Sequence, residues 1–145
     1  MPSPVAMSAL TAGAVGAALL FTAAPAVAET HTGMPTLYAM YDGGLCLSTI
    51  NAKVNIFDDS DNVGIGYQTN DVSGTGSAGC GQSVEAVVDW HNLDTGATGT
   101  VSRRMFRNET NSLTITPGAG RIEIELTTGA THFPDASRIT VDMHG

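Results

Sequence analysis

The sequence predicts an all-β fold, an antiparallel, immunoglobulin-like β-sandwich of about seven or eight strands with one disulfide, preceded by a signal peptide. Apolar residues recur at every second position between turn signals, which is the period of a half-buried strand. No helical pattern of 10–15 residues separates these segments, so parallel βαβ units are not expected. The chain of 145 residues fits one domain.

The N-terminal segment, residues 1–28, has the pattern of a signal peptide. Residues 12–20 form an uncharged apolar stretch, and Ala26-Val27-Ala28 is an A-x-A cleavage site before Glu29. We therefore expect a secreted, extracytoplasmic domain of residues 29–145. An uncleaved membrane anchor is the alternative, but alanine and glycine are poorly hydrophobic, and no span is expected in the mature chain.

The strands are expected in eight places along the mature chain. The clearest is residues 121–127, where Ile122, Ile124 and Leu126 alternate with Glu123 and Glu125. The expected strands are residues 36–41, 52–57, 64–69, 83–92, 99–106, 112–116, 121–127 and 138–143.

Turn signals separate these strands. Residues 94–99 contain two glycines and predict a hairpin. Residues 117–120 and 129–134 separate the last strands, and residues 58–62 form an acidic turn.

Two cysteines, Cys46 and Cys80, predict a single structural disulfide in an exported chain. Closing this loop stabilises the fold by roughly 3.5–4 kcal/mol in the chain-entropy model. The spacing is not C-x-x-C, which argues against a redox pair. Trp90 follows both cysteines, so the Cys-Trp-Cys order of true immunoglobulin domains does not transfer.

The run from Val88 to Gly99 (VDWHNLDTGATG), with the glycine-punctuated segments and final short strand that follow it, resembles the C-terminal half of small secreted β-sandwich proteins of actinobacteria. Many proteins of this kind have no assigned function. The resemblance covers about half of the mature domain and rests on turn chemistry. It implies export and an all-β fold, and it carries over no catalytic residue.

The charge balance excludes one class of function. Six Lys and Arg stand against fourteen Asp and Glu, a net charge of −8, and Lys53 is the one lysine. Nucleic-acid binding requires clustered cations that neutralise phosphates, so no nucleic-acid partner is expected.

The acidic turn and the histidines are the candidates for a metal site. Asp58, Asp59, Asp61 and Asn62 could offer oxygens to Ca²⁺, but the EF-hand spacing fails, so a solvated turn is expected. No two of the four histidines have the spacing of a zinc pair, so they are expected on the surface, without metal or cofactor.

A hydrolase is the least favoured alternative. The sequence lacks G-x-S-x-G, and the carboxylate pairs Glu85/Asp89 and Glu123/Glu125 lie on expected solvent faces. They are interpreted as solubilising charge.

The arginine cluster, Arg103, Arg104, Met105, Phe106 and Arg107, is the candidate partner-binding surface. Arg103 would share a strand face with Val101 and Met105, which breaks the alternation and predicts a bulge, an edge strand or a contact surface. Arginine beside Met and Phe is typical of interface cores. An edge strand protected by arginine is the alternative.

The sequence thus predicts an exported, non-catalytic domain that binds a protein or cell-envelope component. A carrier of apolar ligands or lipids is the alternative, with a pocket near Trp90 to which Met34, Met40 and Phe57 could contribute.

Overall fold

The computed structural model describes residues 29–41, 46–57, 60–72, 83–106 and 109–144, and it forms ten strands. They are β1 (Glu29–Gly33), β2 (Leu37–Tyr41), β3 (Cys46–Phe57), β4 (Val63–Asp71), β5 (Ser83–Asn92), β6 (Thr98–Phe106), β7 (Thr110–Ile115), β8 (Gly120–Thr128), β9 (Thr131–Phe133) and β10 (Ser137–Met143).

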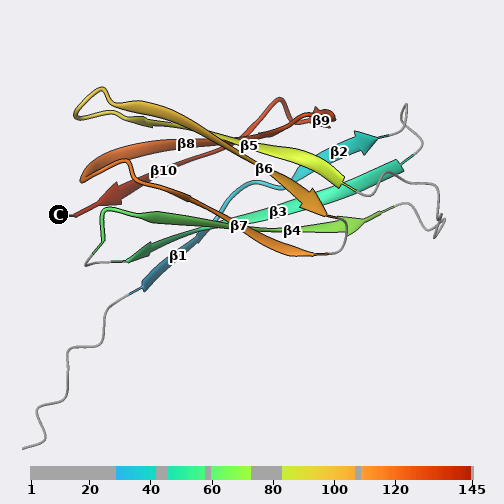
Figure 1. The fold of residues 1–145 in the computed structure, drawn as a ribbon, viewed down its shortest axis with the longest axis horizontal. Helices are drawn as coiled ribbons and strands as arrows, with labels where there is room; N and C mark the ends of the chain where they lie inside the picture. Colours follow the sequence, from blue (N-terminus) through green and yellow to red (C-terminus); the bar gives the residue numbers. More distant parts are fainter. Residues whose placement is uncertain (1–28, 42–45, 58–59, 73–82, 107–108, 145) are drawn as a thin grey trace, which may run out of the picture.

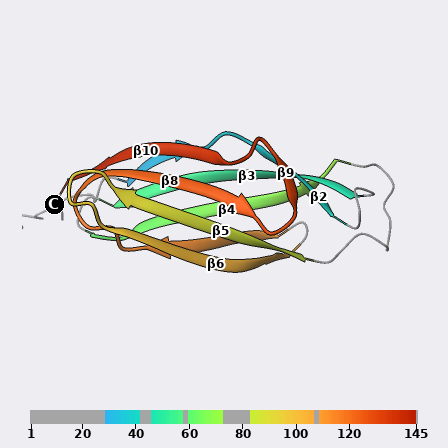
Figure 2. The same cartoon turned by 90° about the horizontal axis from the view of Figure 1, so that it is seen from above.

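The strands form two antiparallel sheets that pack as two layers (Figure 1). Sheet A has six strands, ordered β7-β4-β3-β2-β9, with β1 also paired to β3. Sheet B has four strands, ordered β10-β8-β5-β6, and Figure 2 looks down on them. After β6 each successive strand lies in the other sheet, so every one of these connections crosses between the layers.

The core lies between the two sheets and follows the alternation of the sequence. Sheet A contributes Ile50 and Ile65, and sheet B contributes Val88, Ile124 and Leu126, all with no exposed surface. Each outward neighbour of these residues is polar or partly exposed, as in other two-layer antiparallel folds. The prediction of an all-β, antiparallel, two-layered fold is therefore confirmed.

Each of the eight expected strands is present, but three parts of the sheets were missed. β1 and β9 were not expected, because five-residue and three-residue segments rich in Thr and His have no apolar period. β3 begins at Cys46, whereas the expected strand began at Ala52. Ser48 interrupts the apolar alternation in this part of the strand, because it is a polar residue at a buried position. Its hydroxyl donates to the Asp71 carboxylate at 2.9 Å.

Parts of the prediction lie outside the described residues. Residues 1–28, the expected signal peptide, and Cys80, the expected partner of the buried Cys46, are among them, so export and the disulfide remain predictions. Within the described ranges, there is no helix of the length and apolarity that a membrane crossing needs.

Candidate functional site

On the outer face of sheet B, the pairing of the strands places charged side chains opposite one another. Asp89 of β5 lies directly opposite Glu125 of β8 and, on its other side, opposite Thr100 of β6. Arg138 of β10 lies opposite Glu125 and completes this row of side chains across all four strands. The next row has the same form, and it consists of Thr140, Glu123, His91 and Thr98.

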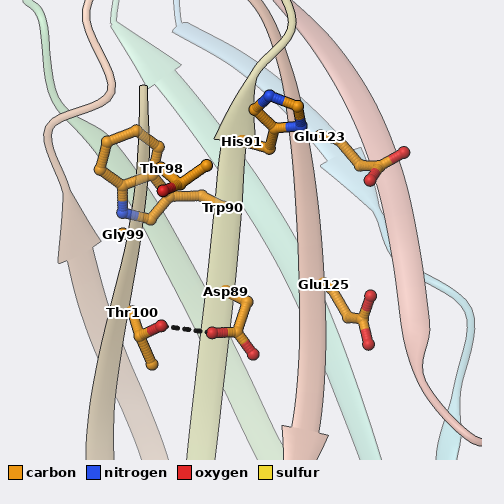
Figure 3. A pocket seen from close by; sticks show the side chains of 8 residues that line it. All are labelled: Asp89, Trp90, His91, Thr98, Gly99, Thr100, Glu123 and Glu125. Atoms are coloured by element: carbon orange, nitrogen blue, oxygen red, sulfur yellow. Dashed lines mark hydrogen bonds between the residues drawn. The ribbon is translucent and has the colours of Figure 1, made fainter. Parts of the chain in front are cut away.

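A shallow hollow of about 280 Å³ lies across these two rows (Figure 3). We call it the acidic hollow. It is lined by Asp89, Trp90, His91, Thr98, Gly99, Thr100, Glu123 and Glu125. Three of its side chains are carboxylates on two adjacent strands, so the surface is suited to a cation or to a hydrogen-bond donor.

The two carboxylates of the first row have different surroundings. Glu125 accepts two hydrogen bonds from the Arg138 guanidinium, at 2.8 and 3.1 Å. This contact raises the pKa of Arg138 above its usual value. Asp89 accepts a hydrogen bond from the Thr100 hydroxyl, which is neutral. Two like charges on directly opposed positions of an antiparallel pair repel each other, so the first row carries an electrostatic cost that Arg138 offsets from one side.

Trp90 forms the β6 side of the hollow. Its position on β5 faces inward, opposite the buried Ile124, and its half-buried ring packs against the core. The ring lies beside Gly99 of β6 (Figure 3), so close that a Cβ at position 99 would lie 2.6 Å from two of its carbons. Gly99 is therefore required for this packing. Figure 3 also shows that the Glu123 and Glu125 carboxylates extend away from Trp90, towards β10.

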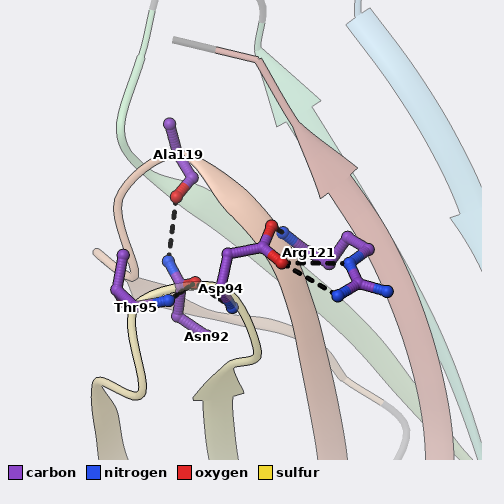
Figure 4. Close-up of polar contacts among 5 residues, drawn as sticks. All are labelled: Asn92, Asp94, Thr95, Ala119 and Arg121. Carbon is purple, nitrogen blue, oxygen red and sulfur yellow. Dashed lines mark hydrogen bonds and ion pairs between the residues drawn. The ribbon is translucent and has the colours of Figure 1, made fainter.

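The end of sheet B beside the hollow is held by one buried amide (Figure 4). The Asn92 side chain has no exposed surface, and its amide nitrogen donates to the carbonyls of Pro117 and Ala119 at 3.0 and 2.9 Å. Its oxygen accepts from the backbone N–H groups of Asp94 and Thr95, each at 3.1 Å. The four bonds satisfy the amide completely and join the β5–β6 turn to the β7–β8 connection.

Asp94 fixes the same turn from the solvent side (Figure 4). It accepts hydrogen bonds from the backbone N–H of Arg121 and, at 2.9 and 3.1 Å, from its guanidinium. Both contacts lower the pKa of Asp94, and the hydrogen bond from the Arg121 backbone has a larger effect than the bonds from its side chain. Gly96 has a φ of 77°, as the turn requires. The residues Asn92, Asp94, Gly96 and Gly99 of the Val88–Gly99 run therefore have structural roles.

The arginine cluster is not a single surface, because β6 is a strand without a bulge between Thr98 and Phe106. Arg103 and Met105 face inward, and Met105 is 1% exposed, which contradicts the expectation that it is open to a partner. Arg104 and Phe106 face outward, and Arg107 lies outside the described residues. Among the three expected alternatives, the edge strand is confirmed.

Arg103 has a specific task at this edge. Its guanidinium donates to the carbonyl of Ser112 on β7 at 2.9 Å, and the Thr69 hydroxyl donates to the carbonyl of Phe106 at 3.0 Å. Both bonds join sheet A to sheet B along the side where β6 and β7 run together. An inward-pointing charge on an edge strand also opposes edge-to-edge association.

Of the candidate calcium ligands in the acidic turn, the structure describes Asp61 and Asn62. The side-chain oxygen of Asn62 accepts from the Thr116 hydroxyl at 2.7 Å, and Asp61 is exposed. Asp58 and Asp59 lie outside the described residues. Within the described part of the chain, no three His, Cys, Asp or Glu side chains are arranged to hold a metal ion.

The residues proposed to form a carrier pocket differ in burial. Met34 is 8% exposed and belongs to the core, whereas Met40 and Phe57 are exposed at 39% and 38%. The hollow beside Trp90 opens on the outer face of sheet B, and three of its eight lining residues are carboxylates, which suit a polar ligand better than an apolar one.

The sequence located Glu85, Asp89, Glu123 and Glu125 on outward faces, and the register shows which of them meet. The hydrolase pairs were chosen within one strand, but Asp89 faces Glu125 on the neighbouring strand. Glu85 instead lies opposite Arg104 and accepts a hydrogen bond from Ser102 at 2.7 Å. Pairing between strands was the missing information, and no residue pattern within one strand contains it.

Three histidines are exposed as expected, and His132 is not. It is half-buried, and both of its ring nitrogens lie at 2.8 Å from backbone carbonyl oxygens.

In comparisons with known proteins, the chain matches no family model, no curated protein and no solved structure.

Proposed function

We propose that this chain is an exported, non-catalytic binding domain that holds a basic group of a protein or cell-envelope partner in the acidic hollow. The observation that carries the proposal is the pairing of Asp89 with Glu125 on directly opposed positions, beside Glu123 in the next row. The same proposal includes a signal peptide, a Cys46–Cys80 disulfide and an immunoglobulin-like sandwich. It also includes the resemblance to secreted actinobacterial β-sandwich proteins.

The argument for a cationic group starts from the cost of this arrangement. Opposed like charges on neighbouring strands destabilise an antiparallel pair by about 0.2–1 kcal/mol. An ammonium or guanidinium group bound to Asp89 and Glu123 would offset the repulsion between Asp89 and Glu125 and gain two charge-assisted hydrogen bonds. Local features that cost stability without a structural gain concentrate at functional sites, which supports the hollow as the contact surface.

The same surroundings argue against catalysis. Glu125 is held by the two hydrogen bonds of Arg138, so it is committed to a structural ion pair. The hollow is open and shallow, and acid–base chemistry on a paired carboxylate needs a cleft that excludes water. Binding is the activity that this geometry supports.

A lysine pentapeptide is a suitable first probe, titrated at low ionic strength and followed by calorimetry. We expect Asp89→Asn to weaken binding about three- to tenfold, because one ion pair of the complex is lost. Asp61→Asn is the matched control, since Asp61 is exposed in the connection between β3 and β4, away from sheet B, and its replacement changes the net charge equally.

Two results would contradict the proposal. One is an equal loss of affinity in both variants, which would assign binding to net charge alone. The other is that the wild-type chain gives no heat of binding with the peptide at low salt, where exposed charge pairs are least screened.

A further inference from the structure

His132 lies in the connection between β8 and β10, residues 129–136, which includes the short strand β9. β9 pairs with β2 at three positions, from Tyr38↔Phe133 to Met40↔Thr131, and so covers the edge of β2 in sheet A (Figure 1). A three-residue strand has too few ladder bonds to stay in place by itself, so other contacts must hold it.

The His132 ring supplies such contacts at both ends of β9. Its Nδ1 lies 2.8 Å from the carbonyl oxygen of Ala130, just before β9, and its Nε2 lies 2.8 Å from that of Asp135, just after it. A carbonyl oxygen can only accept a hydrogen bond. A neutral imidazole has one N–H and one lone pair, so it can satisfy only one of these oxygens.

The neighbouring hydroxyl does not remove the conflict. Thr128 donates to the same Ala130 oxygen at 3.1 Å and lies 3.3 Å from Nδ1. Its proton could turn to Nδ1 in the neutral ring, but Nδ1 and the Ala130 oxygen would then face each other, at 2.8 Å, with lone pairs. Only the doubly protonated ring donates to both carbonyls.

We infer that His132 is a proton-dependent clamp that holds β9 against the edge of β2 when the ring is an imidazolium and loosens it when the ring is neutral. In acid the clamp is closed at both ends. As the pH rises and the ring loses a proton, one carbonyl contact turns repulsive and that end of β9 is released. The outcome is a pH-controlled exposure of the β2 edge, whose free backbone groups can pair with another strand.

Other titratable groups border the connection. They are Asp135 within the connection, Tyr38 on β2, Glu85 on β5 beside Gly129, and Arg138 on β10. The neighbour from β8, Thr128, carries no charge. Between about pH 5 and 8 the side chain that ordinarily changes charge is histidine. The response in this range therefore reports on imidazole groups, and histidine variants can separate them.

Amide hydrogen exchange of residues 38–40 and 131–133 tests the clamp, with protection factors corrected for the intrinsic effect of pH. We expect wild-type protection at the β2–β9 pairs to fall about tenfold between about pH 5.5 and pH 8, the effect of one charged hydrogen bond. His132→Gln, neutral at every pH, should show low protection throughout. His144→Gln, which replaces an exposed histidine just after β10, should keep the wild-type response.

A response to pH that His132→Gln retains in full would overturn the inference, as would wild-type protection that does not change. If the variant does not fold, the wild-type ring decides the matter by itself. Two-bond ¹H–¹⁵N NMR correlations distinguish an imidazolium from either neutral tautomer. A neutral His132 ring at about pH 5.5 would contradict the clamp, and an imidazolium there would support it.

Discussion

The outer faces of the two sheets differ in charge although their strands alternate in the same way. On β3, β4 and β7 of sheet A, the described outward side chains are mainly amides, hydroxyls and glycines, with Lys53 as the charged exception. On sheet B, carboxylates and arginines face each other in rows across the strands. A polar outer face with few charges, such as that of sheet A, is enough for solubility. The charged rows of sheet B therefore need a further explanation, and a binding surface supplies one.

The largest expected effect comes from the amide that holds the end of sheet B. Asn92→Asp would place a carboxylate oxygen against the carbonyls of Pro117 and Ala119, where the amide now donates. A buried charge without donors is costly, so the free energy of unfolding should fall by about 3 kcal/mol or more. Urea denaturation measures the change.

Asn51→Asp on sheet A is the matched control. Asn51 is exposed, and its oxygen accepts from the Thr36 hydroxyl at 2.9 Å, a bond that a carboxylate also accepts. The change should be within about 0.5 kcal/mol. Equal losses in the two variants would show that the amide of Asn92 has no special place in the fold.

The glycines of the two sheets give the second contrast. Gly99→Ala in sheet B puts a Cβ 2.6 Å from the Trp90 ring and should destabilise the chain by about 1–3 kcal/mol. Gly64→Ala in sheet A meets only ordinary contacts, the nearest at 3.8 Å, and should be neutral or slightly stabilising. Thermal unfolding of both variants, with Trp90 fluorescence as the local probe, gives the comparison; a harmless Gly99→Ala would contradict the described ring position.

A smaller effect of opposite sign is expected at the hollow. Asp89→Asn removes the repulsion from Glu125 and keeps an oxygen for Thr100, so unfolding at low salt should become harder by about 0.2–1 kcal/mol. Glu125→Gln removes the same repulsion but also loses the Arg138 ion pair, so it should stabilise the chain less than Asp89→Asn does. The gain for Asp89→Asn should shrink in high salt, and a destabilised Asp89→Asn would argue that the row carries no electrostatic cost.

The smallest effect is an acid sensitivity. Hydrogen bonds from Arg121 lower the pKa of Asp94 below its value of 3.8 in the unfolded chain. The stability from this contact is therefore complete above about pH 4 and is lost as the pH falls through the lowered pKa. Asp94→Asn should unfold more easily than wild type near neutral pH, and the difference should diminish towards about pH 2. A difference that stays constant over this range would exclude the ionised contact as its source.

Much of this fold follows from the sequence, because alternation is a local property. Ile122, Ile124 and Leu126 specify both a strand and its buried face without knowledge of any neighbour. The same alternation assigned Met105 to the face of Val101, but the flanking arginines made it look exposed. β1 and β9 escaped prediction because their stability comes from pairing with β3 and β2 and not from an apolar pattern.

The candidate site could be predicted only in part. The four outward carboxylates were found individually, whereas the meeting of Asp89 with Glu125 depends on the register between β5 and β8. The role of Asn92 depends in the same way on carbonyls 25 and 27 residues along the chain. The clamp geometry of His132 was invisible, since a histidine in a turn gives no signal of the carbonyls it meets.

We expect the acidic hollow to be the place where a basic group binds. The most direct test is a ¹H–¹⁵N NMR titration of the oxidised domain, residues 29–145, with the lysine pentapeptide at low salt. We expect shift changes concentrated at residues 89–91, 98–100 and 123–125 of sheet B, saturating together. Shifts spread evenly over both sheets, or confined to the amide-rich face of sheet A, would contradict it.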